Sequence, residues 1–227
     1  MIAGMTPRSA ANGTPPSPSE QQPATVYIVD DDHDLCDILG RTLNWAGYRH
    51  VACESGFHAL ESITPQRAGC VLIDLHLPDM TGLELRKRLL AQYCRHPFII
   101  LTGSGDVSLA VQSLQEGAVD FVQKPFQQRR LLARVAEAVE RDRNRREIEH
   151  RVDGLTDRER EVLWLVAEGH VTKEIARRFG ISPRTVDVHR YNILHKMRVP
   201  SLAQLLQVLN RHHTVRDGGS VVGRVGG

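Results

Sequence analysis

Short apolar runs alternate with amphipathic stretches along the first half of the chain. Five runs have the length of a β-strand, at Val26–Val29, His50–Cys53, Cys70–Leu75, Phe98–Gly103 and Val119–Gln123. Stretches with helical periodicity lie between them, at Leu35–Trp45, Gly82–Gln92 and Leu109–Gln115. Most of the strand-length runs are continuously apolar, which indicates parallel strands buried between two layers of helices. The pattern therefore predicts an α/β fold, a doubly wound five-stranded parallel sheet.

The pattern becomes charged between Gln127 and Arg151. An apolar helical stripe comes first, formed by Leu131, Leu132, Val135 and Val139. The segment ERDRNRREIEHR follows and carries charge at nearly every position. We predict that the last helix of the α/β domain, which covers residues 24–140, runs into a solvated linker with a helical extension at 141–153.

Only helical patterns with short breaks remain after Leu155, which predicts a small all-α domain over residues 154–213. Thr156 and Glu159 form a capping box that opens its first helix. The inner stripe of this helix is Leu163, Val166 and Ala167, and Gly169 ends it. The second helix spans Thr172–Phe179, with Ile175, Ala176 and Phe179 facing inward. Gly180 supplies a turn before a third helix that is capped by Ser182 and begins at Pro183.

Two helices joined by a short glycine-containing turn are typical of a helix-turn-helix, in which the later helix lies in the DNA major groove. At about 100° per residue, the core side of the third helix carries Val186, Ile193 and Met197. The opposite side carries the candidate base contacts Arg184, Val188, Tyr191 and His195. Lys173 and Thr185 are candidate phosphate contacts. The alternative is a compact bundle with a solvated basic helix.

Charge is divided unevenly between the two halves of the chain. Residues 24–127 contain 8 Lys and Arg against 13 Asp and Glu, a net charge of −5. Residues 155–213 contain 10 against 6, a net charge of +4. This asymmetry favours an acidic domain and a domain that faces nucleic acid, although domains also differ this much by chance.

The remaining features of the sequence concern its ends, cysteines and location. Residues 1–23 and 214–227 are rich in small and polar residues, so we expect a disordered leader and a disordered tail. The four cysteines have no CxxC spacing, which favours reduced, half-buried thiols over a metal site or disulfides. No run approaches the roughly 18 apolar residues of a membrane span. We therefore expect no membrane association and a cytoplasmic location.

Polar residues follow four of the predicted strands. The first strand is followed by Asp30 and Asp31, the third ends at Asp74, the fourth at Thr102, and Lys124 follows the fifth. In a doubly wound sheet these ends share one rim. Two carboxylates about 4 Å apart repel by roughly 4 kcal/mol at an effective dielectric of 20, so the cluster needs a cation. Oxygen ligands favour Mg²⁺ at Asp30, Asp31 and Asp74, and Lys124 and Thr102 could stabilise a phosphoryl group on the nucleophile Asp74.

Each of these residues also has a purely structural explanation. Carboxylates after a strand often cap the next helix, as Asp32 or Asp34 could do here. A Lys-Pro pair after a strand is commonly a turn. The occurrence of such residues at four strand ends together favours the functional interpretation.

The segments IVDDD, VLIDLHLPDMTG, ILTGSGD and GAVDFVQKPF resemble the signature blocks of the receiver domain of two-component response regulators. The resemblance implies a CheY-like, flavodoxin-like fold. It further implies Mg²⁺ at Asp30 and Asp31, phosphorylation of Asp74 by a sensor histidine kinase, and phosphoryl contacts from Thr102 and Lys124. Phe121 matches the aromatic switch residue of this family. His76 and Ser104 occupy positions that vary in the family and tune dephosphorylation.

The C-terminal segments LTDREREVLWLVAEG, TKEIA and ISPRTVDVH resemble the LuxR-type helix-turn-helix of the NarL/FixJ family, and SPRTVDVHR points to its FixJ-like branch. The resemblance implies double-stranded DNA as a partner and a dimerisation helix at Leu202–Leu209. Asp187 departs from relatives that carry a basic, base-contacting residue there. An acid could repel phosphate or accept from a cytosine amine.

We expect a response regulator, not an enzyme, that dimerises on phosphorylation of Asp74 and then regulates transcription, with RNA polymerase as a further expected partner. Two other readings remain open. A phosphatase of the haloacid dehalogenase type also uses a strand-end Asp, Mg²⁺, Thr and Lys, although Asp34 stands where its motif has Thr or Val and the chain is too short for a cap domain. A DNA-binding protein with a vestigial receiver is the second alternative.

Overall fold

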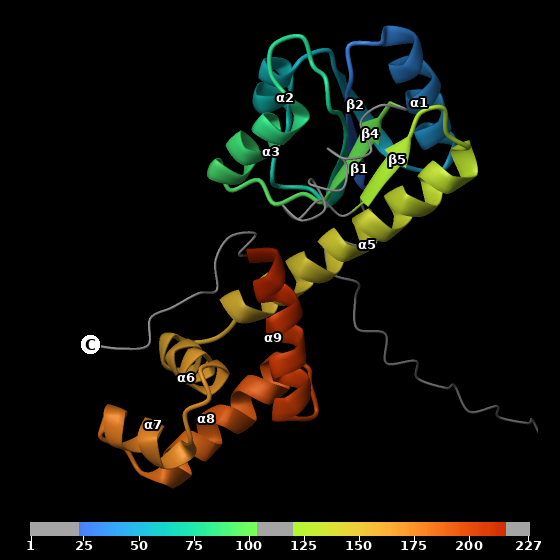
Figure 1. The fold of residues 1–227 in the computed structure, drawn as a ribbon. Helices are drawn as coiled ribbons and strands as arrows, with labels where there is room; N and C mark the ends of the chain where they lie inside the picture. Colours follow the sequence, from blue (N-terminus) through green and yellow to red (C-terminus); the bar gives the residue numbers. More distant parts are fainter. Residues whose placement is uncertain (1–22, 104–119, 217–227) are drawn as a thin grey trace, which may run out of the picture.

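The strands of the N-terminal domain form one parallel sheet in the order β2-β1-β3-β4-β5 (Figure 1). The computed structural model describes residues 23–103 and 120–216. The strands are β1 (Thr25–Val29), β2 (Arg49–Cys53), β3 (Gly69–Asp74), β4 (Phe98–Thr102) and β5 (Asp120–Gln123). The described helices of this domain are α1 (His33–Trp45), α2 (Gly56–Ser62), α3 (Gly82–Ala91) and α5 (Gln128–Asp153). This is the doubly wound sheet that the apolar pattern predicts.

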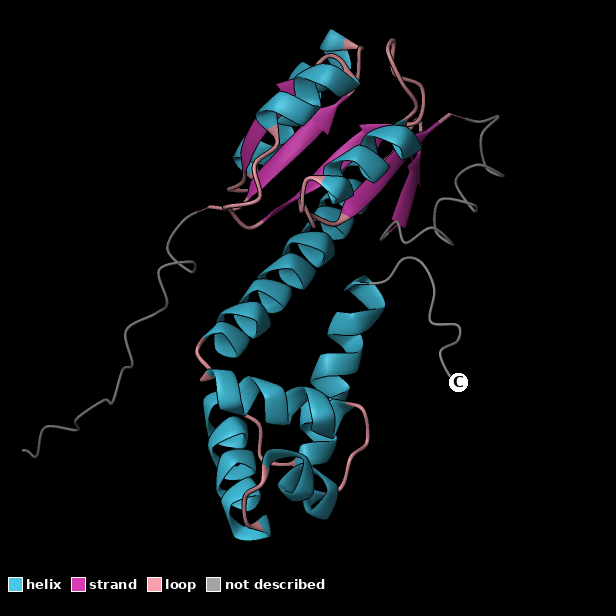
Figure 2. Cartoon of the chain, turned by 90° about the vertical axis from the view of Figure 1, so that its left-hand side faces the viewer, coloured by secondary structure: helices cyan, strands magenta, loops and turns pink. Residues whose placement is uncertain are grey.

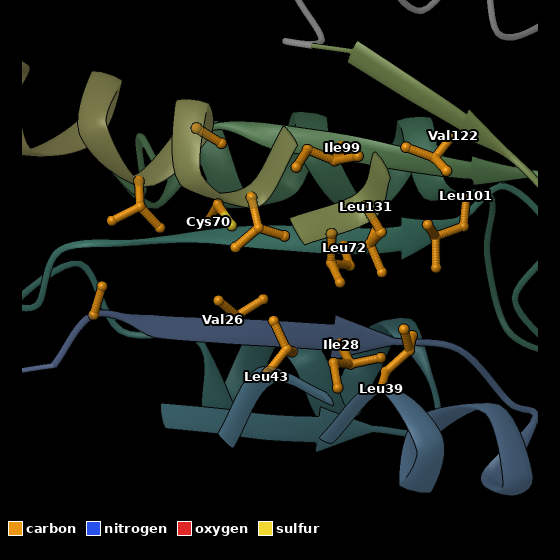
Figure 3. Packing of buried hydrophobic residues seen from close by; sticks show 14 of the residues in the cluster. Val26, Ile28, Leu39, Leu43, Cys70, Leu72, Ile99, Leu101, Val122 and Leu131 are labelled. Carbon is orange, nitrogen blue, oxygen red and sulfur yellow. The ribbon is translucent and has the colours of Figure 1, made fainter. Parts of the chain in front are cut away.

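Alternate residues of each strand contribute to separate cores on the two faces of the sheet. Ile28, Leu72 and Ile99 pack beneath α1 and α5, where Leu39, Leu43 and Leu131 meet them (Figure 3). The intervening residues pack against α2 and α3, and they include Tyr27, Val71 and Ile100. Since side chains alternate across a strand, strands covered on both faces need apolar residues at every position. This explains the continuous apolar runs in the sequence.

Local capping chemistry determines where the helices of this domain begin. Asp32 caps α1, because its Oδ1 accepts from the backbone N–H of Leu35 at 3.0 Å. The helix therefore begins two residues earlier than its apolar periodicity predicts. Helix α2, capped by Ser55, is short and was not predicted from the pattern. The predicted helix Leu109–Gln115 and Ser104 lie outside the described residues.

The C-terminal domain is helical and follows α5 directly. Its described helices are α6 (Asp157–Ala167), α7 (Thr172–Phe179), α8 (Pro183–Lys196) and α9 (Leu202–Arg216). The predicted capping box of Thr156 and Glu159 is present, and Gly180 ends α7 with a left-handed φ of 64°. Val186, Ile193 and Met197 are buried as predicted. Ala167 is exposed, which corrects the predicted inner stripe of α6, because the buried face of α6 is Val162, Leu163, Leu165 and Val166.

Helix α5 extends from the sheet domain to the helical domain as one element of 26 residues (Figure 2). Its first half packs in the core of the sheet domain through Leu131 and Val135, and Ile148 and Val152 pack against the core of the helical domain. The expected solvation of the charged stretch is wrong at Asp142, which is fully buried.

The structure also bears on the chain ends and the cysteines. Helix α9 ends at Arg216, beyond the predicted Leu202–Leu209 and within the first residues of the predicted tail. The predicted leader lies outside the described residues except for residue 23. All four cysteines are free and buried rather than half-buried. None of the helices within residues 23–103 and 120–216 has the length and apolar character needed to cross a bilayer.

Candidate functional site

The strand ends that carry the predicted site residues lie at the point where the order of the sheet reverses. From β1 the chain goes outward to β2 and then returns past β1 to β3, so the carboxyl ends of β1 and β3 are neighbours. Ligands of doubly wound sheets bind in the crevice outside such a switch point. Asp30 directly follows β1, and Asp74 is the last residue of β3.

The ammonium group of Lys124 joins two carboxylates from distant parts of the sequence. Its Nζ donates to Oδ2 of Asp30 at 2.7 Å and to Oδ2 of Asp74. The backbone N–H of Lys124 donates to the carbonyl oxygen of Thr102 at 2.7 Å, which ties the end of β5 to the end of β4. Residues from four strand ends are thereby brought to one place.

Burial and the contacts between Lys124 and the two carboxylates act in opposite directions on the pKa values of Asp30 and Lys124. Burial raises the pKa of the Asp30 carboxyl, and the nearby charge of Asp74 raises it further. The hydrogen bonds from Lys124 and from the backbone N–H of Asp32 lower it, but the net pKa is raised. Burial lowers the pKa of Lys124, but its bonds to Asp30 and Asp74 outweigh burial and raise it. The charged form of Lys124 is therefore favoured, and it lies beside Asp30, whose charged form is disfavoured.

Asp74 remains accessible while its backbone is closely held. Its side chain is 16% exposed, compared with 1% for Asp30. Its Oδ1 accepts from the backbone N–H of His76 at 2.9 Å. A Cβ atom added at Gly82 would lie 2.5 Å from the carbonyl oxygen of Asp74, so the start of α3 can approach the end of β3 only with glycine there. Of the two carboxylates that contact Lys124, Asp74 is therefore the more accessible to an incoming group.

The remaining predicted site residues differ in their exposure and local contacts. Asp31 is exposed, and within the described part of the chain no cluster of three or more His, Cys, Asp or Glu has the geometry of a metal site. Thr102 is buried, and its hydroxyl donates to the carbonyl oxygen of Gly103 at 3.1 Å. Phe121 is half-buried and packs against the core on the α2 and α3 face. His76 is exposed.

The donor set fits Mg²⁺ in its chemistry. Asp30, Asp74 and Asp31 offer only oxygen ligands, and the raised pKa of Asp30 shows that a further positive charge would be favourable there. Mg²⁺ usually keeps several waters and needs few protein ligands. The carboxylates of Asp30 and Asp74 are therefore enough protein ligands for this ion.

Sequence reasoning missed Asp79, which lies in the loop after β3. Its two carboxylate oxygens accept from the backbone N–H groups of Gly56 and Phe57 at 2.8 and 2.7 Å, at the start of α2. The loop after Asp74 is thereby attached to a neighbouring helix. The only signal in the sequence was Ser55 before GFHAL, a capping residue ahead of a helix too short to show periodicity.

The buried carboxylate of Asp30 is expected to affect the stability of the protein. We expect Asp30→Asn to raise the free energy of unfolding by about 1 kcal/mol at neutral pH without added metal, because it removes an unfavourable charge. A raised pKa means that the folded protein binds a proton more readily than the unfolded chain. The wild type should therefore lose stability as the pH rises through this pKa, and the variant should not. Urea unfolding at a series of pH values from acidic to neutral measures the stability of the wild type and of the variant.

Asp31→Asn is the matched control, since it removes the same charge from an exposed neighbour. It should change stability by no more than about 0.5 kcal/mol. Equal or lower stability of Asp30→Asn compared with this control would contradict the electrostatic assignment.

The second candidate surface is the exposed side of α8. Arg184, Val188, Tyr191 and His195 are all exposed, with Val188 at 53% and Tyr191 at 69%. Ser182 caps the helix by accepting from the backbone N–H of Thr185 at 3.1 Å, and the hydroxyl groups of the two residues are 2.8 Å apart. Lys173 is exposed near the start of α7. This face of α8 therefore presents one aliphatic and one aromatic side chain among polar ones.

Asp187 makes a contact that the sequence did not reveal. The hydroxyl of Thr172 donates to Oδ1 of Asp187 at 3.4 Å and accepts from Nη1 of Arg190 at 2.7 Å. Thr172 is the first residue of α7, so these bonds join the two helices of the helix-turn-helix. The structure thus gives Asp187 a role within the protein, beside the two roles toward DNA that the sequence left open.

Comparisons with known protein families agree with both halves of this description. The response regulator receiver domain family matches residues 26–136, and the luxR family of bacterial regulatory proteins matches residues 153–209. These matches define a two-component response regulator with a DNA-binding output domain. Receiver domains typically bind Mg²⁺ for phosphorylation and take the phosphoryl group from a histidine kinase. Proteins of this class are transcription regulators and not enzymes.

The chain belongs to the FixJ-like response regulators with a LuxR-type helix-turn-helix. The transcriptional regulatory protein FixJ of Bradyrhizobium diazoefficiens is 36% identical over 199 residues, which cover 85% of this chain and 97% of that protein. The response regulator protein TmoT of Ectopseudomonas mendocina is 32% identical and covers 84% of this chain and 90% of that protein. The solved structure of the response regulator StyR is 33% identical, with a TM-score of 0.53, covering 84% of this chain and all of that one.

Proposed function

We propose that Asp74 accepts a phosphoryl group from a phosphohistidine of a sensor kinase, and that this controls DNA binding by the α7 and α8 unit. The observation that carries the proposal is the ammonium of Lys124, which bridges Oδ2 of Asp74 and Oδ2 of Asp30. A cation held beside an accessible carboxylate is suited to neutralise the charge that phosphorylation adds.

In the transfer step this chain supplies the nucleophile, a cation and a hydroxyl group, and the kinase supplies the phosphohistidine. A carboxylate oxygen of Asp74 attacks phosphorus while the P–N bond of the phosphohistidine breaks, and the bonding electron pair returns to the imidazole nitrogen. Lys124 can follow the new phosphoryl oxygens because it already contacts Asp74. The hydroxyl of Thr102 gives up its local bond to Gly103 in order to donate to a phosphoryl oxygen.

We assign Asp30, Asp31 and Asp74 as the residues that hold Mg²⁺ at this site. When bound, the ion supplies positive charge to the transferring phosphoryl oxygens. Burial of Asp30 next to Asp74 makes the site favourable for a divalent cation. Mg²⁺ should therefore raise the thermal midpoint of the wild type and raise that of Asp30→Asn less.

The proposed output combines a switch and dimerisation. Movement of Thr102 toward the phosphoryl group leaves space that Phe121, half-buried on the adjacent strand, can enter. The changed surface favours a homodimer, with α9 as a dimerisation helix, and two helix-turn-helix units then reach half-sites about 34 Å apart. RNA polymerase is a further proposed partner, and the proposed site of action is the cytoplasm.

Contacts to double-stranded DNA are assigned to the exposed faces of α7 and α8. Arg184, Val188, Tyr191 and His195 are proposed to face base edges, and the apolar Val188 suits a thymine methyl group. Lys173 and Thr185 are proposed to contact phosphates, which fix register without reading sequence. The exposure of all six residues on neighbouring helices supports this assignment.

The second prediction distinguishes the two kinds of contact. Arg184→Ala should weaken binding to a duplex selected by the wild type by about 1–3 kcal/mol and leave binding to unrelated DNA nearly unchanged. Lys173→Ala should weaken binding to both duplexes and reduce the dependence of log K on log salt by about one unit. Fluorescence anisotropy at several salt concentrations measures both effects.

Arg67→Ala is the control, because it removes one exposed positive charge from the sheet domain. It should change neither affinity nor salt dependence appreciably. An Arg184→Ala protein that loses affinity equally for all DNA would show that Arg184 contacts phosphate and not a base.

The proposed phosphorylation of Asp74 is tested by identifying the residue that is modified. The full chain is incubated with acetyl phosphate and Mg²⁺, the acyl phosphate is trapped by borohydride reduction, and peptides are identified by mass spectrometry. Modification of Asp74 alone supports the proposal. Modification of another carboxylate, or none, would overturn it.

A further inference from the structure

A second cluster of buried charges lies at the other end of the sheet, away from Lys124. Its centre is Asp142, a residue of α5 that is 0% exposed. The carboxylate accepts from the backbone N–H of Gly69 at 3.0 Å, from Nε of Arg146 at 2.7 Å and from Nη2 of Arg145. Nδ1 of the buried His96 is 3.5 Å from Oδ2 of Asp142. Donors from the beginning of β3 and from α5 itself thus converge on one carboxylate, and the ring of His96 lies beside it.

The surrounding groups favour the charged form of Asp142. Burial raises the pKa of this carboxyl, but the neighbouring His96 and the positive charges of Arg145 and Arg146 outweigh burial and hold the pKa well below its usual value. Nε2 of His96 must carry a proton, because its partner at 2.9 Å is the carbonyl oxygen of Thr64, which can only accept. This arrangement fixes the orientation of His96 toward Asp142.

Asp142 connects α5 to the two strands that carry the phosphorylation machinery. Gly69, which donates to Asp142, is the first residue of β3, and β3 ends at Asp74. His96 lies two residues before β4, and β4 ends at Thr102. The carboxylate therefore bonds the helix to the beginning of β3 and lies against the residue that precedes β4 by two positions. Hydrogen bonds to the carboxylate require donors at defined directions, so these contacts constrain the orientation of the helix in addition to the apolar packing around it.

The position of Asp142 along α5 gives this contact its importance. The side chains of α5 in the core of the sheet domain end with Ala138 and Val139. The side chains that pack on the helical domain begin with Ile148, and Nη1 of Arg151 donates to the carbonyl oxygen of Met197 at 3.1 Å. Asp142 lies between these two sets in the sequence of α5, the helix that runs from the sheet domain to the helical domain (Figure 1).

We infer that Asp142 is a positioning residue that fixes the direction of α5, and with it the orientation of the DNA-binding domain relative to the receiver domain. The ion pair of Arg95 with Glu149 at 3.6 Å continues the same contact farther along the helix, but both side chains are about one-third exposed and therefore screened by solvent. Asp142 is the fully buried part of this junction, which makes it the residue whose loss should free the helix.

The test measures the distance between the two domains in the folded full-length protein. Nitroxide labels are attached to cysteines introduced at the exposed residues Glu61 in α2 and Arg178 in α7, and double electron–electron resonance gives the distance distribution. The native cysteines are at most 7% exposed, and the chain without introduced cysteines reports any background labelling. Asp142→Asn keeps an acceptor for Gly69 but loses the charge that Arg145 and Arg146 require, so the distribution should broaden and shift.

Asp153→Asn is the matched control, since it makes the same change at an exposed position of the same helix. Its distribution should equal that of the wild type. A purely stabilising role of Asp142 would lower the thermal midpoint and leave the distribution of folded molecules unchanged, and that result would overturn the inference. Should Asp142→Asn fail to fold, Arg146→Gln removes one ion pair from the half-buried side of the cluster. It should broaden the distribution to a smaller extent, and an unchanged distribution would overturn the inference equally.

A further readout rests on the proposed function. If phosphorylation of Asp74 controls DNA binding, its effect on affinity in the wild type should fall in the usual range of about 5- to 150-fold. In Asp142→Asn the ratio should approach one, while acetyl phosphate still labels the protein. A wild type that takes up no label would contradict the proposed function and leave the distance result intact. A labelled Asp142→Asn protein with the full ratio would contradict the inference alone.

Discussion

Asp74→Asn protein is expected to take up no phosphoryl group from acetyl phosphate, whereas the wild type is expected to be labelled. The amide of asparagine has nearly the same shape as the carboxylate and can still accept from the backbone N–H of His76, which is 2.9 Å from Oδ1 in the wild type. It has no charged oxygen that can act as a nucleophile toward phosphorus. The expected effect is complete loss of labelling in a folded protein, measured by intact-protein mass spectrometry.

Asp37→Asn is a suitable control, because it removes one carboxylate from the exposed surface of α1. It should be labelled as the wild type is. Labelling of Asp74→Asn would show that the acceptor is another residue. If the unlabelled Asp74→Asn protein bound a selected operator as tightly as the phosphorylated wild type, the alternative of a phosphorylation-independent DNA-binding protein would be supported.

Gly69→Ala is expected to cause the largest loss of stability. Gly69 pairs with Thr25 where β3 runs beside β1, and a Cβ atom added there would overlap the carbonyl oxygen of Thr25. The overlapping atom is backbone and cannot turn aside as a flexible side chain can. The backbone N–H of Gly69 also donates to the buried Asp142. Separation of the strands would disturb both contacts, so we expect a loss of about 3 kcal/mol or more in unfolding free energy.

Urea unfolding followed by circular dichroism measures this loss, and poor soluble yield is the expected extreme. Gly154→Ala serves as the comparison, because the nearest atom to its added Cβ would be at 3.4 Å and its φ of −75° is an ordinary helical value. It should be neutral or stabilising by about 0.5 kcal/mol. A Gly69→Ala protein within about 1 kcal/mol of the wild type would contradict the close approach of β1 and β3.

Much of the fold could be predicted because its signals are local. The strands are continuous apolar runs, and the caps at Asp32, Thr156 and Ser182 use residues within three positions of the groups they bind. The left-handed turn at Gly180 likewise depends on one residue. Helix α2 was missed because seven residues are too few to establish a period, and the burial of Asp142 was missed because a charged surface pattern does not show what covers it.

The sequence by itself determined which residues stand at the strand ends and which side of α8 is polar, since both follow from the spacing of apolar positions. Only the tertiary structure decided which carboxylates meet Lys124. Asp30 and Asp74 are 94 and 50 residues away from it and contact it, while Asp31, adjacent to Asp30, faces solvent. It also decided that Asp142, within a run of charges, is buried. Such pairings depend on how strands and helices pack, and sequence spacing carries no information about partners so far apart.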